Sequence, residues 1–350
     1  MTANAVDRPV VVNALSLRPA GAGISTYIRE LLAALPPLWQ QQVHAHVQDD
    51  AVGDLPGSVS STGWPVSSGT RRAVRAALLP HGAGVFHSLD VDLPLRAGRG
   101  SVITVHDLSV FDVPWAFDRF RSSAERLLVR HAMTRADVVL ADSHFTARRI
   151  RKRFGRDSVV AHLAASSDMQ PADDRTKEEV VERYGLHEDF VLFVGTVEPR
   201  KDVPLLAQAC YELSLPLVLA GGAFGPQPDL PGRVRRLGFV PAADLPALYG
   251  AARVVAYPSL YEGFGLPPVE ALACGAALVC SRVADLQDLL HDGAVFFDAR
   301  DPDGIRRALK DVWHDEGQRK ELRERGLAAV GSLSWARTAA ITTDVYEGFR

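Results

Sequence analysis

The stretch YPSLYEGFGLPPVEALACG, residues 257–275, joins a short apolar run to a glycine-rich turn and then to a helical pattern. The run at residues 254–257 predicts a strand. The glycines in EGFG, residues 262–265, predict a tight turn, because glycine accepts backbone angles that other residues resist. The two prolines that follow suit the first turn of a helix over residues 267–274, and Gly275 suits its end. A strand, a turn and a helix are therefore expected in direct succession.

The amino end of this predicted helix is a candidate anion site. The first N–H groups of a helix lack partners within it, and the helix dipole places partial positive charge there. Glu262 comes just before this end, and Glu270 is expected in the first helical turn. Taken singly, Glu270 could merely complement the dipole and Glu262 could be an ordinary turn acid. Their combination with the turn indicates a ligand that carries both sugar hydroxyls and phosphate.

The same succession of strand and helix repeats along the whole chain. In the first half, strands are expected over residues 9–15 and near Val85, Ile103 and Val139, and helices over residues 24–35 and 119–133. In the second half, strands are expected over residues 189–195, 215–222 and 254–257 and near Phe239 and Val279, with a helix from about Val203. This alternation predicts an α/β protein with parallel sheets covered by helices.

A chain of 350 residues suits about two domains. The polar stretch SSDMQPADDRTKEE, residues 166–179, reads as a linker. We therefore expect one domain over residues 1–166 and a second over 167–333. Residues 334–350 read as a terminal helix that crosses back toward the first domain. Ligands of open parallel sheets bind outside the carboxyl ends of the strands, so we expect the site in a cleft between the two sheets.

The composition excludes several classes of protein. A net charge of −3 does not indicate a nucleic-acid binder, 47% hydrophobic residues suffice for buried cores, and a charged fraction of 23% excludes a disordered chain. Three cysteines do not make a disulfide framework, which favours a cytoplasmic protein. The start MTANAVDRP lacks the pattern of a signal peptide, and no run reaches the ~18 apolar residues of a membrane span.

EGFGLPPVE has the form E-x7-E and resembles the signature of the retaining glycosyltransferases of family four. The segments NALSLRPAGAGISTYIREL, TVHDL, FVGTVEPRKDVPLL, LGFVPAADLPALYGAA and SWARTA occur in the family's order, so the resemblance covers nearly the whole chain. It implies the GT-B fold, in which two Rossmann-like domains face each other across a cleft. It also implies transfer of a sugar from a nucleoside diphosphate to an acceptor hydroxyl.

The resemblance assigns roles to residues of the second domain. Glu270 would bind the ribose hydroxyls of the nucleotide, and Glu262 would hold hydroxyls of the donor sugar. A carboxylate that accepts two neighbouring hydroxyls is a sound ribose clamp. The remaining residues implied at the donor are Gly263, Phe264, Gly265 and Leu266, through their backbone N–H groups, and Val240.

Arg200 and Lys201, in GTVEPRKD, follow a predicted strand and could neutralise the diphosphate leaving group. The alternative is an ordinary solvated pair of cations after a proline. Many relatives read GRLEPRKG, so this chain has Thr196 in place of an arginine and Asp202 in place of a glycine. Arg200 is our hypothesis for what compensates the loss at Thr196.

The first domain offers two candidate loops. Gly21 and Gly23, in AGAGIS, would lie against the diphosphate and the acceptor, although a plain strand–helix turn explains them equally well. Relatives often read GIGRYI, so Ser25 and Thr26 stand in place of glycine and arginine and put these contacts in question. His106, in TVHDLS, would lie beside the reacting sugar, where its backbone carbonyl stabilises positive charge at the anomeric carbon; a lone histidine is otherwise more often structural.

Four further residues or runs have alternative interpretations. Asp107 would orient either the loop or an acceptor, and His87 is a weaker candidate for the cleft. The basic run at residues 147–156 reads as a solvated helix face, or as a surface for anionic lipid or a phosphorylated acceptor. Ser143, just before it, suits a helix N-cap.

The expected reaction needs no metal and no cofactor, because Arg200 and Lys201 supply the charge and no DxD pair lies beside the diphosphate loop. The donor would be a sugar linked to UDP, GDP or dTDP. The acceptor would be a hydroxyl-bearing glycoside, a lipid-linked sugar or a natural product, with membrane contact at most peripheral. Antibiotic tailoring of the orthosomycin type and surface-polysaccharide assembly are the competing roles, and the domains are expected to close on the donor.

Three alternatives belong to other classes. A glycosidase could use two acids as acid and nucleophile, but the neighbouring cations fit a phosphate leaving group better. A sugar-nucleotide epimerase of the same architecture would need no acceptor. A non-catalytic protein would bind the nucleotide sugar only.

Overall fold

The computed structural model describes residues 9–19, 21, 23–39, 41–82, 84–222 and 228–349, with the side chains of residues 119–121 left out. Residues 1–8, which carry the expectation about a signal peptide, lie outside these ranges. The chain divides into two compact units. Unit 1 comprises Met1–Leu163 together with Ser334–Arg350, and unit 2 comprises Ala164–Leu333. Unit 2 is therefore inserted between the two segments of unit 1.

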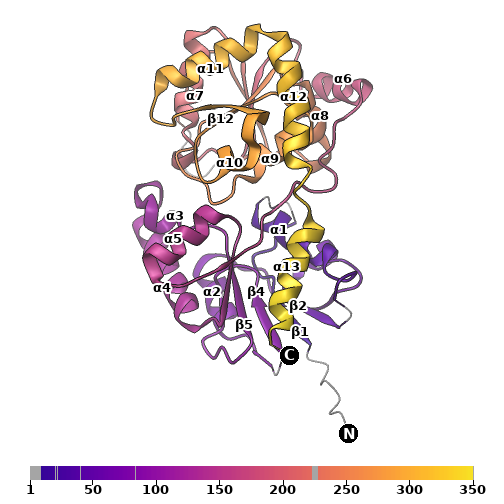
Figure 1. The fold of residues 1–350 in the computed structure, drawn as a ribbon, viewed down its shortest axis with the longest axis vertical. Coiled ribbons are helices and arrows are strands. Elements are labelled where there is room, and N and C mark those ends of the chain that lie inside the picture. Colours follow the sequence, from indigo (N-terminus) through magenta and orange to yellow (C-terminus); the bar gives the residue numbers. More distant parts are fainter. Residues whose placement is uncertain are drawn as a thin grey trace. The chain divides into compact units, whose positions relative to one another are not determined.

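Unit 1 contains a seven-stranded parallel sheet in the order β3-β2-β1-β4-β5-β6-β7 (Figure 1). Its strands are β1 (Val10–Asn13), β2 (Val43–Gln48), β3 (Ser60–Trp64), β4 (Val85–Ser88), β5 (Ser101–Val105), β6 (Val138–Ala141) and β7 (Val159–Val160). The chain runs outward from β1 to β3 and then returns to place β4 on the other side of β1. The switch point of the sheet, where ligands of such folds bind, is therefore between β1 and β4.

Helices from both segments of unit 1 cover its sheet. They are α1 (Ile24–Ala34), α2 (Gly69–Ala77), α3 (Ser109–Asp112), α4 (Arg119–Arg135), α5 (His144–Phe154) and α13 (Trp335–Glu347), with 3-10 turns η1 (Asp49–Asp54) and η2 (Pro114–Ala116). In Figure 1 the yellow helix α13 lies beside elements from the indigo start of the chain. Its Trp335 ring is 6.2 Å from the ring of Tyr27 on α1, and its Tyr346 hydroxyl is 2.7 Å from His87 Nδ1 on β4. The last helix thus completes the core of unit 1.

Unit 2 contains a six-stranded parallel sheet in the order β10-β9-β8-β11-β12-β13. Its strands are β8 (Val191–Val194), β9 (Leu217–Ala220), β10 (Val234–Gly238), β11 (Val254–Tyr257), β12 (Leu278–Ser281) and β13 (Ala294–Phe297). Its helices are α6 (Asp174–Arg183), α7 (Val203–Glu212), α8 (Leu245–Ala251), α9 (Leu266–Ala273), α10 (Leu286–Leu290), α11 (Pro302–His314) and α12 (Glu316–Val330), with 3-10 turns η3 (Pro199–Lys201), η4 (Ala242–Asp244) and η5 (His291–Gly293). The switch point of this sheet is between β8 and β11.

These two parallel-sheet units confirm the predicted α/β class. Two expectations need correction. The polar stretch at residues 166–179 is not all linker, because α6 begins at Asp174. The carboxylate of Asp173 caps this helix by accepting a hydrogen bond from the Thr176 N–H at 2.7 Å. The strand expected near Phe239 ends at Gly238.

No helix within the described ranges is long and apolar enough to cross a bilayer. The three cysteines, Cys210, Cys274 and Cys280, are buried free thiols.

Candidate active site

Two loops meet at the switch point of unit 2, one after β8 and one after β11. The Leu260 N–H donates to the Arg200 carbonyl at 2.8 Å, and the Arg200 guanidinium donates to the Tyr261 carbonyl at 3.1 Å. These bonds bring the EPRK segment against the EGFG turn, although the two lie some sixty residues apart in the chain. The sequence-predicted cations and acids of unit 2 therefore share one site.

Glu262 is held as a carboxylate at this site. Arg200 Nη1 donates to one of its oxygens at 2.8 Å, and the Ser259 hydroxyl donates to the other at 2.8 Å. Burial opposes its ionisation, but Arg200 and Lys201 lower the pKa of Glu262 below its ordinary value. Both of its oxygens are oriented from within the protein before any ligand is present.

Arg200 and Lys201 have different surroundings. Arg200 bridges two acids, because its Nη2 also lies 2.8 Å from a Glu198 oxygen. Lys201 is 8% exposed, and its nearest ion-pair partner among the described residues is Glu198 at 4.0 Å. Gly195 makes room for the ammonium: a Cβ there would lie 2.8 Å from Lys201 Nζ, and φ is +143°. Lys201 is thus the cation less committed to internal ion pairs.

Glu270 is the fifth residue of α9, and this corrects its expected place in the first turn. The helix begins at Leu266 because Gly265, with φ +96°, ends the turn there. The side chain is buried, and its best-defined partner is the Tyr249 hydroxyl at 3.5 Å. Burial raises the pKa of Glu270 to about 7, while the Tyr249 contact and the charge of Lys201 act in the opposite sense.

The amino end of α9 lacks a side-chain cap. Pro267 and Pro268 have no N–H group, so fewer donors are left at this end than in an ordinary helix. Phe264 and Leu266, on either side of Gly265, are buried. Val240, the remaining predicted contact, is buried just after β10, at the same carboxyl edge of the sheet.

In unit 1, His106 follows β5 and is held as an imidazolium. Its Nδ1 lies 2.7 Å from an Asp142 carboxylate oxygen, and its Nε2 lies 3.0 Å from the Leu89 carbonyl. Both partners only accept hydrogen bonds, so both ring nitrogens carry protons. Burial alone would lower the pKa of His106, but Asp142, with help from Asp90 and Leu89, raises it to about 9. Both ring nitrogens are therefore occupied within the protein.

Two neighbours of His106 have structural roles. The Asp107 carboxylate accepts the Ser109 N–H at 2.7 Å, so it orients the loop that leads into α3. His87, a candidate for the cleft, is instead fully buried. Burial and the charge of His106 lower the pKa of His87 to about 3, and its ring bonds Thr104 and Tyr346. His87 is a neutral core residue.

The side chain of Ser25 holds the glycine loop of unit 1 together by a hydrogen bond within the loop region. The Ser25 hydroxyl accepts the Arg18 N–H at 3.0 Å, and a Cβ at Gly21 would lie 2.2 Å from this oxygen. Gly23, with φ +59°, starts α1. Ala20 and Ala22 lie outside the described residues. The serine that departs from the family pattern therefore bonds the backbone at Arg18, and Gly21 leaves the space that its hydroxyl occupies.

Comparisons with known proteins identify the family of this chain. Residues 174–328 match the family described as Glycosyl transferases group 1. The O-antigen chain mannosyltransferase B of Escherichia coli is 33% identical over 283 residues, which cover 75% of this chain and 74% of that protein. The chain belongs to the group 1 glycosyl transferases. A D-inositol 3-phosphate glycosyltransferase of Salinispora tropica is 28% identical, with 94% of this glycosyltransferase and 78% of that protein covered. Longer serotype-specific mannosyltransferases of E. coli match over about 29% of their own length.

Solved structures show the same GT-B fold. A sucrose-phosphate synthase from Thermosynechococcus elongatus superposes with a TM-score of 0.79 at 19% identity and covers 97% of this glycosyltransferase and 98% of that chain. The Anabaena protein Alr3699/HepE, solved with UDP and glucose, has a TM-score of 0.76 at 17% identity and covers 97% and 99%. The predicted GT-B fold is confirmed.

Sequence reasoning missed several partners in this glycosyltransferase. Glu198 bridges Arg200 and Lys201, Asp142 fixes His106, and Tyr249 contacts Glu270. The contact of Glu198 could have been predicted from EPRK, because an acid two residues before an arginine can pair with it within one short turn. Asp142 and Tyr249 have no local signal, because they lie 36 and 21 residues from their partners.

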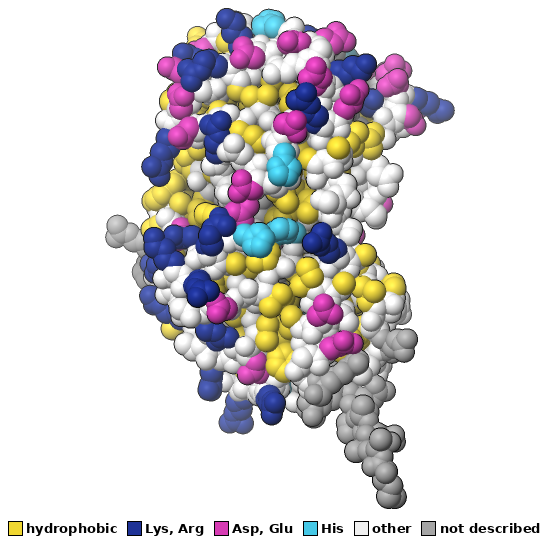
Figure 2. Space-filling model, viewed as in Figure 1, with side chains coloured by type: hydrophobic (Ala, Val, Ile, Leu, Met, Phe, Trp, Pro, Cys, Tyr) yellow, Lys and Arg dark blue, Asp and Glu magenta, His cyan; other side chains and the backbone are white. Residues whose placement is uncertain are grey.

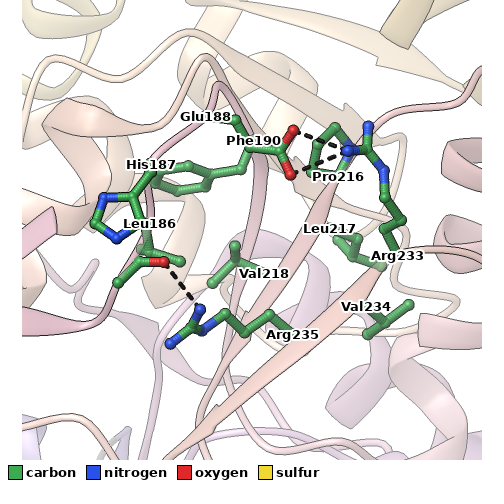
Figure 3. A pocket seen from close by; sticks show the side chains of 11 residues that line it. Leu186, His187, Glu188, Phe190, Pro216, Leu217, Val218, Arg233, Val234 and Arg235 are labelled. Atoms are coloured by element: carbon green, nitrogen blue, oxygen red, sulfur yellow. Dashed lines mark hydrogen bonds and ion pairs between the residues drawn. The ribbon is translucent and has the colours of Figure 1, made fainter. Parts of the chain in front are cut away.

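A separate hollow of about 380 Å³ lies at the opposite edge of the unit 2 sheet, at the amino ends of β9 and β10 (Figure 3). Its two arginines already have partners: Arg233 binds Glu188 at 2.8 Å, and Arg235 donates to the Gly185 carbonyl at 2.9 Å. None of the predicted site residues of the glycosyltransferase lines it.

Proposed function

We propose that this glycosyltransferase moves a sugar from a nucleoside diphosphate to an acceptor hydroxyl with retention of anomeric configuration. The observation that carries the proposal is the cluster at the switch point of unit 2. This cluster contains a hydrogen-bonded carboxylate, Glu262, and a second buried carboxyl group, Glu270. The positive charge of Lys201 acts to lower the pKa of both. Two acids suit sugar and ribose hydroxyls, and a cation between them suits diphosphate.

Each residue has a role in the proposal. Glu270 binds the ribose hydroxyls, Glu262 binds hydroxyls of the donor sugar, and Lys201 neutralises the leaving diphosphate. Arg200, which bridges Glu198 and Glu262, positions Glu262 and adds to the positive field. These ion pairs weaken the hypothesis that Arg200 compensates for Thr196, because its guanidinium already binds Glu198 and Glu262. Lys201 is the better candidate for the phosphate contact.

The proposed mechanism needs no nucleophile from the protein. The acceptor oxygen attacks the anomeric carbon on the face from which the diphosphate leaves, and the departing phosphate takes the acceptor proton. The protein supplies positioning and charge stabilisation. In unit 1, the imidazolium of His106 is saturated by Asp142 and Leu89, so we assign it to fixing the loop and its backbone carbonyl near the sugar.

The acceptor that we propose is a growing glycan. The E. coli relative named O-antigen chain mannosyltransferase B supports this class and favours mannose as the transferred sugar. The names of the relatives described above do not refer to antibiotic tailoring. The donor base is uridine, guanosine or thymidine, as the family resemblance implies.

The test is calorimetry with UDP, GDP, dTDP and ADP. One diphosphate should bind the wild type, and a ligand at 100 times its dissociation constant adds about 2.7 kcal/mol of stability. Glu270→Ala and Lys201→Ala should each weaken binding at least tenfold, as expected when a charge-assisted contact is lost. Lys320→Ala, at an exposed position of α12, is the matched control and should bind normally.

Product analysis then separates the alternatives. A transferase consumes the nucleotide sugar only with an acceptor, and NMR of the product reports whether the anomeric configuration is retained. Conversion of the nucleotide sugar without an acceptor would identify an epimerase. Binding without turnover of any kind would identify a non-catalytic protein, and an inverted product would refute the retaining mechanism.

A further inference from the structure

Glu270 is a carboxyl group removed from the surface of the protein. Many other acidic side chains are spread over that surface, as the magenta groups in Figure 2 show. Glu270, on α9, is only 9% exposed. A buried carboxylate has lost most of its hydration, so the protein must supply hydrogen bonds in place of water if the group is to ionise. The groups that supply these bonds determine how Glu270 presents its charge.

Two buried tyrosines form a chain of hydroxyl groups that ends at Glu270. The Tyr257 hydroxyl, at the end of β11, lies 3.2 Å from the Tyr249 hydroxyl on α8. The Tyr249 hydroxyl in turn lies 3.5 Å from Glu270 Oε2. A carboxylate only accepts hydrogen bonds, so Tyr249 gives its single proton to Glu270 and must accept the proton of Tyr257. The hydrogen bonds of the chain therefore point from Tyr257 to Tyr249 to Glu270.

The two hydroxyls have no other partner in the part of the chain that the structure describes. Tyr249 is 0% exposed and Tyr257 is 2% exposed, so water does not reach them. Phenylalanine would fill the same space without a polar atom to satisfy. Burial raises the pKa of both tyrosines well above the ordinary value of 10, so both keep their protons in neutral solution. The contact with Glu270 thus accounts for both hydroxyls.

This chain occupies one oxygen of Glu270 and leaves the other accessible. Oε2 accepts from Tyr249, whereas no described group bonds Oε1. Oε1 is also not one of the fully enclosed polar atoms that lack a partner, so solvent reaches it. A hydroxyl of a ligand can therefore donate to Oε1 while Tyr249 holds the carboxylate in place.

The other titratable groups around Glu270 come from several elements. Burial raises the pKa of Glu270, and of the two effects that lower it, the Tyr249 bond is larger than the charge of Lys201 in η3. Cys274, just after α9, has its own pKa raised by burial and by Glu270. Helix α12 and strand β12 also pack against α9, but no described group on either acts on the pKa of Glu270. Tyr249 is therefore the main group that favours the ionised form.

We propose that Tyr249 and Tyr257 are positioning residues that orient Glu270 and hold it ionised for the hydroxyl groups of a ribose. The inference rests on the proposed function, in which Glu270 is the carboxylate that binds the ribose. Tyr249 acts on Glu270 directly, and Tyr257 acts only through Tyr249. A protonated Glu270 would have one acceptor position fewer for the ribose.

The test is calorimetry of the wild type and Tyr249→Phe from pH 6 to pH 9, with whichever of UDP, GDP, dTDP and ADP the wild type binds. Loss of one hydrogen bond to a charged group should raise the pKa of Glu270 by about one pH unit. Binding should then be about tenfold weaker at pH 6 and equal to that of the wild type at pH 9, where Glu270 is ionised in both proteins. Ionisation of the phosphate affects both proteins alike.

The control removes a hydroxyl that does not contact Glu270. Tyr211→Phe changes an exposed tyrosine on α7 of the same unit and should bind like the wild type at every pH. A loss in Tyr249→Phe of the same size at pH 6 and pH 9 would show a packing defect and overturn the positioning role.

A double-mutant cycle tests the order of the chain. Tyr257→Phe should weaken binding at pH 6 by only about twofold, since it polarises the bond of its neighbour. Tyr249→Phe/Tyr257→Phe should lose no more than Tyr249→Phe alone, because Tyr257 has no other route to Glu270. Losses that multiply in the double variant would show that the two tyrosines act separately and would overturn the chain.

Carbon-13 NMR of the glutamate carboxyl groups separates this inference from the proposed function, because it needs no ligand. Glu270→Gln identifies the signal, whose midpoint should lie near pH 7 in the wild type and about one unit higher in Tyr249→Phe. If the wild type binds none of the four diphosphates, the proposed function fails, and the midpoints still decide whether the tyrosines hold Glu270 ionised. Equal midpoints in a wild type that binds nucleotide would overturn the positioning role alone.

Discussion

Glu270 is a buried carboxyl group whose surroundings oppose its ionisation. Its folded-state pKa of about 7 lies above the ordinary value of 4.5, so the unfolded chain gives up this proton first as pH rises. The resulting cost to stability is absent below about pH 4.5, grows between 4.5 and 7, and is complete above 7. A ligand that donates ribose hydroxyls to Glu270 would offset part of this cost.

Glu270→Gln should therefore stabilise the free protein at pH 8 but not at pH 5. The gain at pH 8 is at most about 3 kcal/mol, the value of a shift of this size. Urea unfolding at the two pH values measures it, with the exposed Glu178→Gln on α6 as control. A gain of the same size at pH 5 would show that packing rather than ionisation is responsible.

At the scale of elements, the ends of β8 and β9 are coupled through a glycine contact. Gly221 follows β9 with φ +139°, and a Cβ there would lie 2.3 Å from the Gly195 carbonyl, which follows β8. Gly195 in turn makes room for Lys201. The close approach of the two strand ends thus determines where the loop with the proposed phosphate cation lies.

Gly221→Ala should destabilise unit 2 by about 1–3 kcal/mol and weaken nucleotide binding, because the loop after β8 must shift. Gly222→Ala is the matched control: its Cβ would meet no atom within 4 Å, and its φ is not positive. Unfolding and calorimetry on both variants measure the difference. If both bind nucleotide like the wild type, the loop tolerates displacement and the coupling argued here is wrong.

Strands and helices differ in how well the sequence predicts them. Strands β8 and β11 are buried along their whole length, so they appear in the sequence as the apolar runs VLFV and VVAY. Strand β3, SSTGW, is an edge strand with mostly exposed residues and has no such run, and it was not predicted. Helix α6 was read as linker because its first six residues, DRTKEE, are polar, and the only buried residue of the helix is Val180, which follows them.

The sequence likewise predicts some features of the candidate site and not others. Motifs place residues that are close in the sequence, such as Glu262 and the glycines after it. They do not reveal which side chains pair across loops. The bond from Arg200 to Glu262 spans 62 residues, and the bond from His106 to Asp142 spans 36. Such pairs depend on strand order, which a single sequence leaves open.

At the scale of the molecule, the last helix belongs to unit 1. Trp335 and Tyr346 of α13 are buried there, and the Thr338 hydroxyl donates to the His162 carbonyl. Unit 2 contains no part of residues 334–350. The consequences of losing this helix should therefore differ between the two units.

Removal of residues 334–350 should unfold unit 1 and leave unit 2 folded. The loss of two large buried aromatic side chains alone costs about 6 kcal/mol or more, which is comparable with the stability of a whole domain. Hydrogen exchange should show loss of protection in β1 and β4 and retention in β8 and β9. Removal of residues 348–350 only is the control and should leave both sheets protected. Loss of protection in β8 would show that unit 2 also depends on the helix.

The insertion of unit 2 has a consequence for synthesis on the ribosome. Translation proceeds from the amino end, and domains usually fold in that order. Here unit 2 is complete once residue 333 has emerged, whereas unit 1 must wait for the final turns of α13. The half of the protein that is made first is thus the half that finishes folding last, and until α13 has emerged its unfilled apolar surface is a natural client for a chaperone.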